Sequence, residues 1–229
     1  MTGTVAVLGA GPGLGVAIAR QFGRRGWRAG LVARSSARLT DEASVLRADG
    51  VAASAYAADL TDPDQVGAAL DAMQIDLGPI DVLAYTPGPG GAAITTASDV
   101  SVDSASAQFS LHVLGAVSAV QHVLPAMLTR GTGTVLLTTG ASSVIPVPAL
   151  GNVGIAMAGL RNWALALHHE LAPRGVHVAT ITIATGIRTG DGANDPDAIA
   201  AHYVDLHERR DRPEQVIGDL EAVRRLISR

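Results

Sequence analysis

A glycine-rich turn near the start of the chain is the first feature that could serve chemistry. Gly9, Gly13 and Gly15 fall in LGAGPGLG, after an apolar run and just before a helical pattern that begins at Val16. A dinucleotide needs this construction, because its pyrophosphate approaches a bare backbone at the N-terminus of a helix. The position between a first strand and a first helix raises the motif above a lone glycine pattern. The sequence therefore predicts a cofactor cleft at this turn.

The end of the second strand favours one nicotinamide cofactor over the other. A carboxylate at this place takes the ribose 2′-hydroxyl of NAD. Here LVARSSARL supplies Arg34, Ser35 and Arg38, and no acid occurs before Asp41. A guanidinium fork suits the 2′-phosphate of NADP, so we expect NADP(H) as the cofactor. The alternative is a solvated arginine at the start of a helix.

The stretch where the acid and base of a nicotinamide enzyme are expected offers a proton almost nothing. The stretch GASSVIPVPALGNVGIAMAGL, residues 140–160, offers two serines and one asparagine among aliphatic groups. His168 and His169 are adjacent on an expected helix, so their side chains point about 100° apart and cannot chelate one ion together. We expect no metal site.

Alternating strand-like and helix-like runs would position these residues. The expected strands cover 4–9, 28–33, 51–57, 80–85, 133–139 and 176–184, and the expected helices cover 13–25, 36–48, 62–77, 104–129 and 148–172. This alternation, with near-continuous apolar strands, predicts an α/β fold: a doubly wound, Rossmann-like parallel sheet with helices on both faces. We expect one domain over residues 1–229. Residues 190–215 are polar and are interpreted as an insertion, either a lid over the cleft or a solvated excursion.

Composition narrows the class of partner. The 229 residues carry a net charge of −4, which shows no basic footprint for nucleic acid or an anionic membrane. The apolar start lacks a basic region and is broken by Gly-Pro-Gly, so we expect neither a signal peptide nor a membrane span, and a cytoplasmic location. The sequence contains no cysteine and no lysine, which excludes chemistry based on either side chain. A small-molecule substrate or ligand is the expected partner.

These motifs resemble those of the short-chain dehydrogenase/reductase family over about residues 3–190. The glycine spacing is that family's, and Asp59 in AADLTD matches the acid that holds the adenine amino group. Gly88 is the one residue that matches the family's motif after the fourth strand. The stretch ATGIRTG is similar to a later Pro-Gly motif of the family. Together with the turn, the resemblance implies cofactor contacts from Gly9, Gly13, Leu14, Gly15, Arg34, Ser35, Asp59, Leu60, Gly88, Gly186 and Thr189.

The catalytic positions of that family are changed in this chain. Its serine, tyrosine and lysine positions fall on Gly140, Val153 and Met157, and its helix asparagine falls on His112. The family's lysine lowers the pKa of the tyrosine, which then protonates the developing alkoxide. Without that pair, hydride transfer to a simple ketone leaves an unstabilised oxyanion. The resemblance therefore implies an atypical active site.

Three other side chains are the candidate catalytic residues: Tyr85, His112 and Ser142. Tyr85 ends a strand where open α/β sheets bind ligands, and it either bonds a substrate oxygen or walls the cleft. His112 either relays a proton or lies in the core. Ser142, like Ser143 beside it, either binds substrate or satisfies the backbone of a turn.

Two classes of function follow from this pattern. The first is an oxidoreductase that uses NADP(H) on a small substrate needing little acid help, such as an iminium ion or a conjugated enone. The second is a catalytically silent or non-redox relative, such as a sensor, a partner subunit, or a cyclase or isomerase that reuses the cleft. Long apolar helices near 104–129 and 148–172 also predict a homodimer or homotetramer, because the resembling family pairs these helices.

Overall fold

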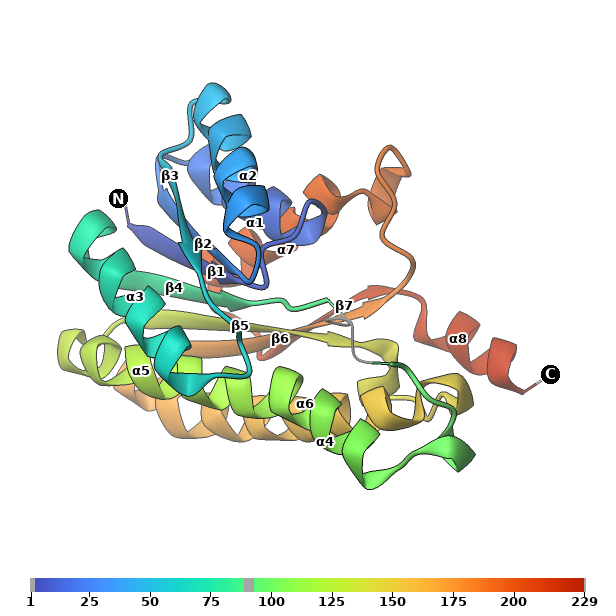
Figure 1. The fold of residues 1–229 in the computed structure, drawn as a ribbon. Helices are drawn as coiled ribbons and strands as arrows, with labels where there is room; N and C mark the ends of the chain where they lie inside the picture. Colours follow the sequence, from blue (N-terminus) through green and yellow to red (C-terminus); the bar gives the residue numbers. More distant parts are fainter. Residues whose placement is uncertain (1–2, 89–92, 229) are drawn as a thin grey trace.

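A computed structural model describes residues 3–88 and 93–228 and contains one parallel seven-stranded sheet (Figure 1). The strand order is β3-β2-β1-β4-β5-β6-β7. The strands are β1 Thr4–Leu8, β2 Arg28–Ala33, β3 Ala53–Ala57, β4 Ile80–Tyr85, β5 Gly133–Gly140, β6 Val176–Ala184 and β7 Glu214–Gly218. The order reverses between β1 and β4, so a crevice forms there at the carboxyl ends of the strands.

Helices cover both faces of the sheet, which confirms the predicted doubly wound fold. The α-helices are α1 Leu14–Gly23, α2 Ser36–Ala48, α3 Pro63–Leu77, α4 Val102–Phe109, α5 Gly115–Arg130, α6 Gly151–Leu171, α7 Pro196–Arg209 and α8 Leu220–Ile227. One apolar core lies between the sheet and α1, α2 and α7, and a second lies between the sheet and α3, α5 and α6. Figure 1 shows α1, α2 and α7 on one side of the strands and α4, α5 and α6 on the other.

Capping residues explain where two of the helices begin. Asp62 accepts hydrogen bonds from the N–H groups of Asp64 and Gln65, and Pro63 occupies the first position of α3. Ser101 and Ser104 form a reciprocal capping box at the start of α4. Each bond satisfies a backbone N–H that has no partner within the helix.

Most of the segment 190–215, expected as a polar insertion, is a packed part of the fold. Tyr203 of α7 is fully buried, and its hydroxyl lies 2.6 Å from Oγ1 of Thr138. The helix packs on α1 and leads into β7, a strand that the sequence pattern did not predict. Between β6 and α7 lies the loop 185–195, which contains the first residues of that segment. A lid function for that loop stays a prediction.

The expected helix 104–129 is divided by five residues of π-helix, Ser110–Leu114, between α4 and α5. The continuous stretch Val102–Arg130 is long and apolar enough to cross a membrane by length and composition alone. Ala116, Val120 and Met127 are buried in the protein core, as expected for a core helix of a globular protein.

Candidate functional site: a cofactor cleft and altered catalytic positions

A cleft of about 930 Å³ lies at the carboxyl ends of β1 to β4. Its wall combines the loop after β1, the start of α2, the turn after β3, the segment after β4 and the junction of α4 with the π-helix. The lining residues are Gly9, Ala10, Gly11, Ala33, Arg34, Ser35, Arg38, Leu39, Asp59, Leu60, Thr61, Pro87, Gly88, Ala107, Ser110 and Leu111. Six of the residues predicted to hold the cofactor are among them: Gly9, Arg34, Ser35, Asp59, Leu60 and Gly88.

Each of the three glycine positions in the first turn has a different structural explanation. Gly9 has a φ of +86°, and a Cβ there would lie 2.5 Å from the backbone of Pro87. A Cβ on Gly15 would lie 2.7 Å from Cα of Ala10, so this glycine lets α1 pack closely on the end of β1. Gly13 precedes α1, and a Cβ there would meet open space. The backbone at Gly13 is therefore accessible to a ligand at a helix N-terminus.

The start of α2 brings two exposed arginines to the cleft. Arg34 and Arg38 both line it, and Ser35 caps α2 by accepting a hydrogen bond from the N–H of Arg38. Ser35 therefore has a structural task in addition to its place in the wall. No carboxylate stands at the end of β2, so the two guanidinium groups give this rim a positive charge.

Asp59, in the turn after β3, faces the same cleft. Its carboxylate accepts hydrogen bonds from the N–H and the hydroxyl of Thr61, at 2.9 and 2.8 Å. These bonds, together with the positive charge of Arg34, hold the pKa of Asp59 below its usual value. The side chain is thus anionic at neutral pH and held in one orientation.

Five of the predicted cofactor residues do not line this cleft. Gly13, Leu14 and Gly15 lie at the start of α1, where the side chain of Leu14 is buried. Gly186 and Thr189 are exposed in the loop after β6. The two ends of that loop are joined by a hydrogen bond within it, from the N–H of Arg188 to the carbonyl of Asn194 at 3.0 Å. Contacts of these five residues with a cofactor stay predictions.

Tyr85 is fully buried at the end of β4, beneath the π-helix. Its hydroxyl donates a hydrogen bond to the carbonyl oxygen of Leu111. The N–H of Gly115 donates to the carbonyl of Ser110, five residues earlier, rather than to that of Leu111 as in an α-helix. The tyrosine hydroxyl therefore donates to a carbonyl that the wider turn leaves without a helical N–H partner. Burial raises the pKa of this tyrosine. This geometry favours a structural role for Tyr85, which holds the lining residue Leu111 from behind, over a bond to a substrate oxygen.

His112 lies within the π-helix and is also buried, with 3% of its surface exposed. Its Nδ1 is buried and has no hydrogen-bond partner among the residues that the structure describes. Burial lowers the pKa of the imidazole to about 4, so the ring is neutral at pH 7. A neutral histidine can accept or donate one proton but supplies no cation.

The turn that follows β5 packs against the helix that carries the family's tyrosine position. The short helical turn Ala141–Ser143 packs on the first turns of α6. Ser143 donates to the carbonyl of Gly140 at 2.8 Å, which is the turn role weighed for it. Ser142 lies against Gly154, the neighbour of Val153. Met157, at the family's lysine position on the same helix, is 8% exposed and supplies no cation.

The sequence interpretation missed Asn152, which is fully buried at the start of α6. Its side-chain oxygen accepts from the N–H of Thr95 at 3.0 Å, and its amide donates to the carbonyl of Ala93 at 2.8 Å. Asn152 thus joins the segment after β4 to the altered catalytic helix. The sequence shows Asn152 as a polar residue in an aliphatic run, which could have marked it as a buried structural residue. Its role could not be predicted because its partners are 57 and 59 residues away in the chain.

The predicted catalytic residues do not form one constellation around the cleft. Within residues 3–88 and 93–228, Tyr85, His112 and Ser142 are absent from its lining, although Leu111 and Ser110 belong to it. In the same residues, no group of three histidine, aspartate or glutamate side chains is placed to hold a metal ion.

Sequence relatives of this chain are oxidoreductases by name. Serine 3-dehydrogenase of Agrobacterium fabrum is 31% identical over 206 residues, which cover 86% of this chain and 80% of that protein. Ketoacyl reductase HetN of Nostoc sp. is 29% identical over 179 residues. The chain spans 61% of the length of HetN and 53% of the 3-dehydrosphinganine reductase TSC10A of Arabidopsis thaliana.

Solved structures share the fold at lower sequence identity. Actinorhodin polyketide ketoreductase, solved as a variant with NADPH, has a TM-score of 0.86 at 21% identity, and the match covers 94% of this chain and 95% of that one. An NADPH-bound short chain oxidoreductase from Pseudomonas aeruginosa, described as containing an atypical catalytic center, has a TM-score of 0.83 at 21% identity, with 94% and 95% covered. The model of the short chain dehydrogenase family matches residues 3–194 of this sequence. The chain therefore belongs to the short chain dehydrogenase family.

Proposed function

We propose that this protein is an NADP(H)-dependent oxidoreductase that acts on a small organic substrate without the tyrosine-lysine pair of its family. The observation that carries the cofactor assignment is the positive rim formed by Arg34 and Arg38, with no carboxylate at the end of β2. The names of several relatives agree with this: L-sorbose reductase from Gluconobacter frateurii is complexed with NADPH, and a metagenomic short-chain oxidoreductase is in complex with NADP.

The residues present fit a phosphorylated dinucleotide. The open backbone at Gly13, at the N-terminus of α1, would receive the pyrophosphate, and Arg34 would bind the 2′-phosphate by a bidentate contact. Asp59, held by Thr61, would accept from the adenine amino group. When bound, NADP(H) supplies or accepts a hydride.

A titration of NADPH and NADH by fluorescence or calorimetry tests the cofactor. We expect NADPH to bind more tightly, and Arg34→Ala to remove most of that preference, because a charge-assisted bond contributes about 1.5–3 kcal/mol. Arg24→Ala, at the exposed residue that follows α1, is the matched control and should keep the preference. Equal affinities of the wild type for the two cofactors would refute the assignment.

The altered positions determine the chemistry we propose. Gly140, Val153 and Met157 supply no acid, base or cation, and an absent general acid forfeits about 10²–10⁴ in rate. The substrate must then carry its own activation, as an iminium ion or a conjugated enone does. Two candidate groups remain: the neutral ring of His112, at the family's asparagine position, and the hydroxyl of Ser142, two residues after its serine position.

An assay of NADPH consumption with simple ketones, cyclic imines and enones tests this chemistry. We expect turnover to be confined to imines or enones, and to fall in Ser142→Ala or His112→Gln without loss of NADPH affinity. Robust turnover of simple ketones by the wild type would contradict the proposal.

A catalytically silent protein is the second candidate, and a specific observation favours it. Within the described residues, none of the three candidate catalytic side chains lines the cleft, and the Tyr85 hydroxyl is already bonded to backbone. Bound NADPH with no turnover of any substrate in the panel would select a ligand-binding role.

A further inference from the structure

A second pocket, of about 500 Å³, lies at the opposite end of the strands from the cofactor cleft. Its walls come from the end of α1, the last turns of α7, and the residues that precede β2 and β5. They are Phe22, Arg25, Trp27, Thr132, Val204, His207, Glu208 and Arg210. Because Trp27 and Thr132 stand just before the first residues of their strands, this pocket belongs to the amino ends of the sheet. It shares no lining residue with the cofactor cleft.

The floor of this pocket is apolar and aromatic. Phe22 is fully buried and Val204 is 1% exposed. The ring of Trp27 meets those of Phe22 and His207 edge to face, with centroids 5.4 and 4.8 Å away. Nδ1 of His207 lies 2.9 Å from Oγ1 of Thr134, and burial lowers the pKa of this histidine to about 4. At neutral pH the histidine is therefore an uncharged aromatic wall.

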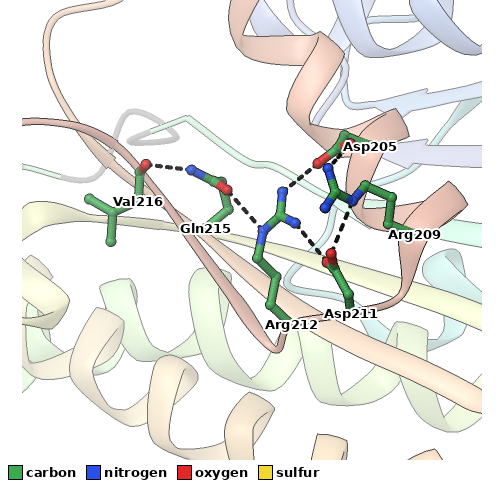
Figure 2. A network of polar contacts seen from close by, with 6 residues as sticks. All are labelled: Asp205, Arg209, Asp211, Arg212, Gln215 and Val216. Carbon is green, nitrogen blue, oxygen red and sulfur yellow. Dashed lines mark hydrogen bonds and ion pairs between the residues drawn. The ribbon is translucent and has the colours of Figure 1, made fainter.

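The turn after α7 directs one arginine to the rim of this pocket. Arg210 has a left-handed φ of 50° at the end of α7. Its neighbours Arg209 and Arg212 form ion pairs with Asp205 and Asp211, and Figure 2 shows that these four side chains share one network. Figure 2 also shows the continuation of the network from Arg212 through Gln215 to the carbonyl of Val216 in β7, so the turn is held at both ends.

Arg210 itself has no carboxylate partner among the described residues. Within residues 3–88 and 93–228, its guanidinium donates to the hydroxyls of Thr132 and Thr134, at 3.3–3.5 Å, and to the carbonyl of His207 at 3.4 Å. The other charges of the rim cancel, since Arg25 pairs with Glu208 at 3.0 Å. The positive charge of Arg210, beside the aromatic floor, is therefore not balanced by a carboxylate of the rim. A guanidinium carries five N–H donors in a plane, which suits it to bind a planar anion.

We propose that this pocket binds a small monoanionic carboxylate with a flat apolar body, of which benzoate is the simplest example. The carboxylate would take the guanidinium of Arg210 and the hydroxyl of Thr132, and the ring would lie against Trp27 and Phe22. The volume suits a ligand of this size, because small-molecule pockets begin near 300 Å³. One negative charge balances the rim, whereas a dianion would meet the carboxylate of Glu208. This site is independent of the proposed cofactor and reaction.

The sequence has two tryptophans, Trp27 and Trp163, so Trp163→Phe leaves one indole as a reporter in the pocket. Sodium benzoate is titrated at constant ionic strength, and we expect a saturable change in the fluorescence of Trp27. Benzamide, which has the same shape without the charge, should bind at least about 10-fold more weakly.

Arg210→Gln in the same background should weaken benzoate by about 10-fold or more, and Arg174→Gln, an exposed arginine outside the pocket, should not. Thr132→Val provides a second variant that leaves the left-handed residue in place, and a severalfold loss is expected. A linear, unsaturable response, equal binding of benzamide, or unchanged affinity in both Arg210→Gln and Thr132→Val would overturn the proposal.

Discussion

Replacing Tyr85 by phenylalanine tests whether this residue is structural or catalytic. The change removes one hydroxyl, whose hydrogen bond ends on the carbonyl oxygen of Leu111. No water replaces the lost donor easily, because Tyr85 is fully buried. The π-helix then keeps a carbonyl that has lost its partner from β4.

The expected cost follows from that unpaired carbonyl. Leaving a buried acceptor without its donor costs about 1–3 kcal/mol of unfolding free energy. In a chain of this size, each kcal/mol lowers the Tm by about 2–4 °C. Urea and thermal unfolding of the two proteins measure the difference. NADPH affinity should fall only slightly, since Leu111 contributes to the cleft wall but Tyr85 does not.

Tyr56→Phe is the matched control, because it removes the same atom from a different pair. The hydroxyl of Tyr56 lies 3.1 Å from the carboxylate of Asp76, a pair nearer the surface, and we expect a loss below about 1 kcal/mol. Our reasoning fails if Tyr85→Phe melts like the wild type, or if it abolishes turnover while stability is unchanged.

Three further predictions concern stability and assembly. Gly115→Ala should destabilise the fold by more than about 1 kcal/mol, because its Cβ would lie 2.3 Å from the carbonyl of Leu60 and from the Tyr85 hydroxyl; urea unfolding measures this. The pKa values of His112, His177 and His207 are lowered to about 4 by burial, so the unfolded chain binds more protons between pH 6.5 and 4. The unfolding free energy should therefore fall as the pH drops through that window, and a flat profile between pH 7.5 and 4.5 would contradict this. Light scattering should report a homodimer or homotetramer at micromolar concentration, and Ile155→Arg, on an exposed apolar position of α6, should shift it toward monomer.

Local patterns predicted the fold well. The bounds of β2, β4, β6 and α2 agree with the sequence interpretation, because apolar runs and turn residues lie next to one another in the chain. The glycine turn and Arg34 also lie where the pattern put them, after β1 and after β2, and their contacts with a cofactor stay predictions. Strand β7 was missed because it is short and half-buried, and it follows a polar stretch.

The role of Tyr85 could not be read from its neighbours in sequence. Its hydroxyl meets a carbonyl 26 residues away, and that carbonyl is available only because the helix widens at this place. The pocket near Arg210 was missed for a similar reason, since its walls come from three stretches that lie far apart in the chain. The charged residues that hold the turn after α7 are visible in the sequence as a run of arginines and aspartates. The sequence does not show which of them pair with one another and which one faces the pocket.

The π-helix at Ser110–Leu114 holds one residue more than an α-helix would need to join the same two ends. Loss of a single residue here would leave an uninterrupted α-helix rather than a broken chain. Because the shorter α-helix joins the same two ends, α4 and α5 would keep their places on the fold. What would be lost is the carbonyl that the wider turn leaves available to the Tyr85 hydroxyl, because every carbonyl inside an uninterrupted α-helix accepts from the N–H four residues later. The extra residue therefore gives the end of β4 an acceptor on this helix that a regular helix would not offer.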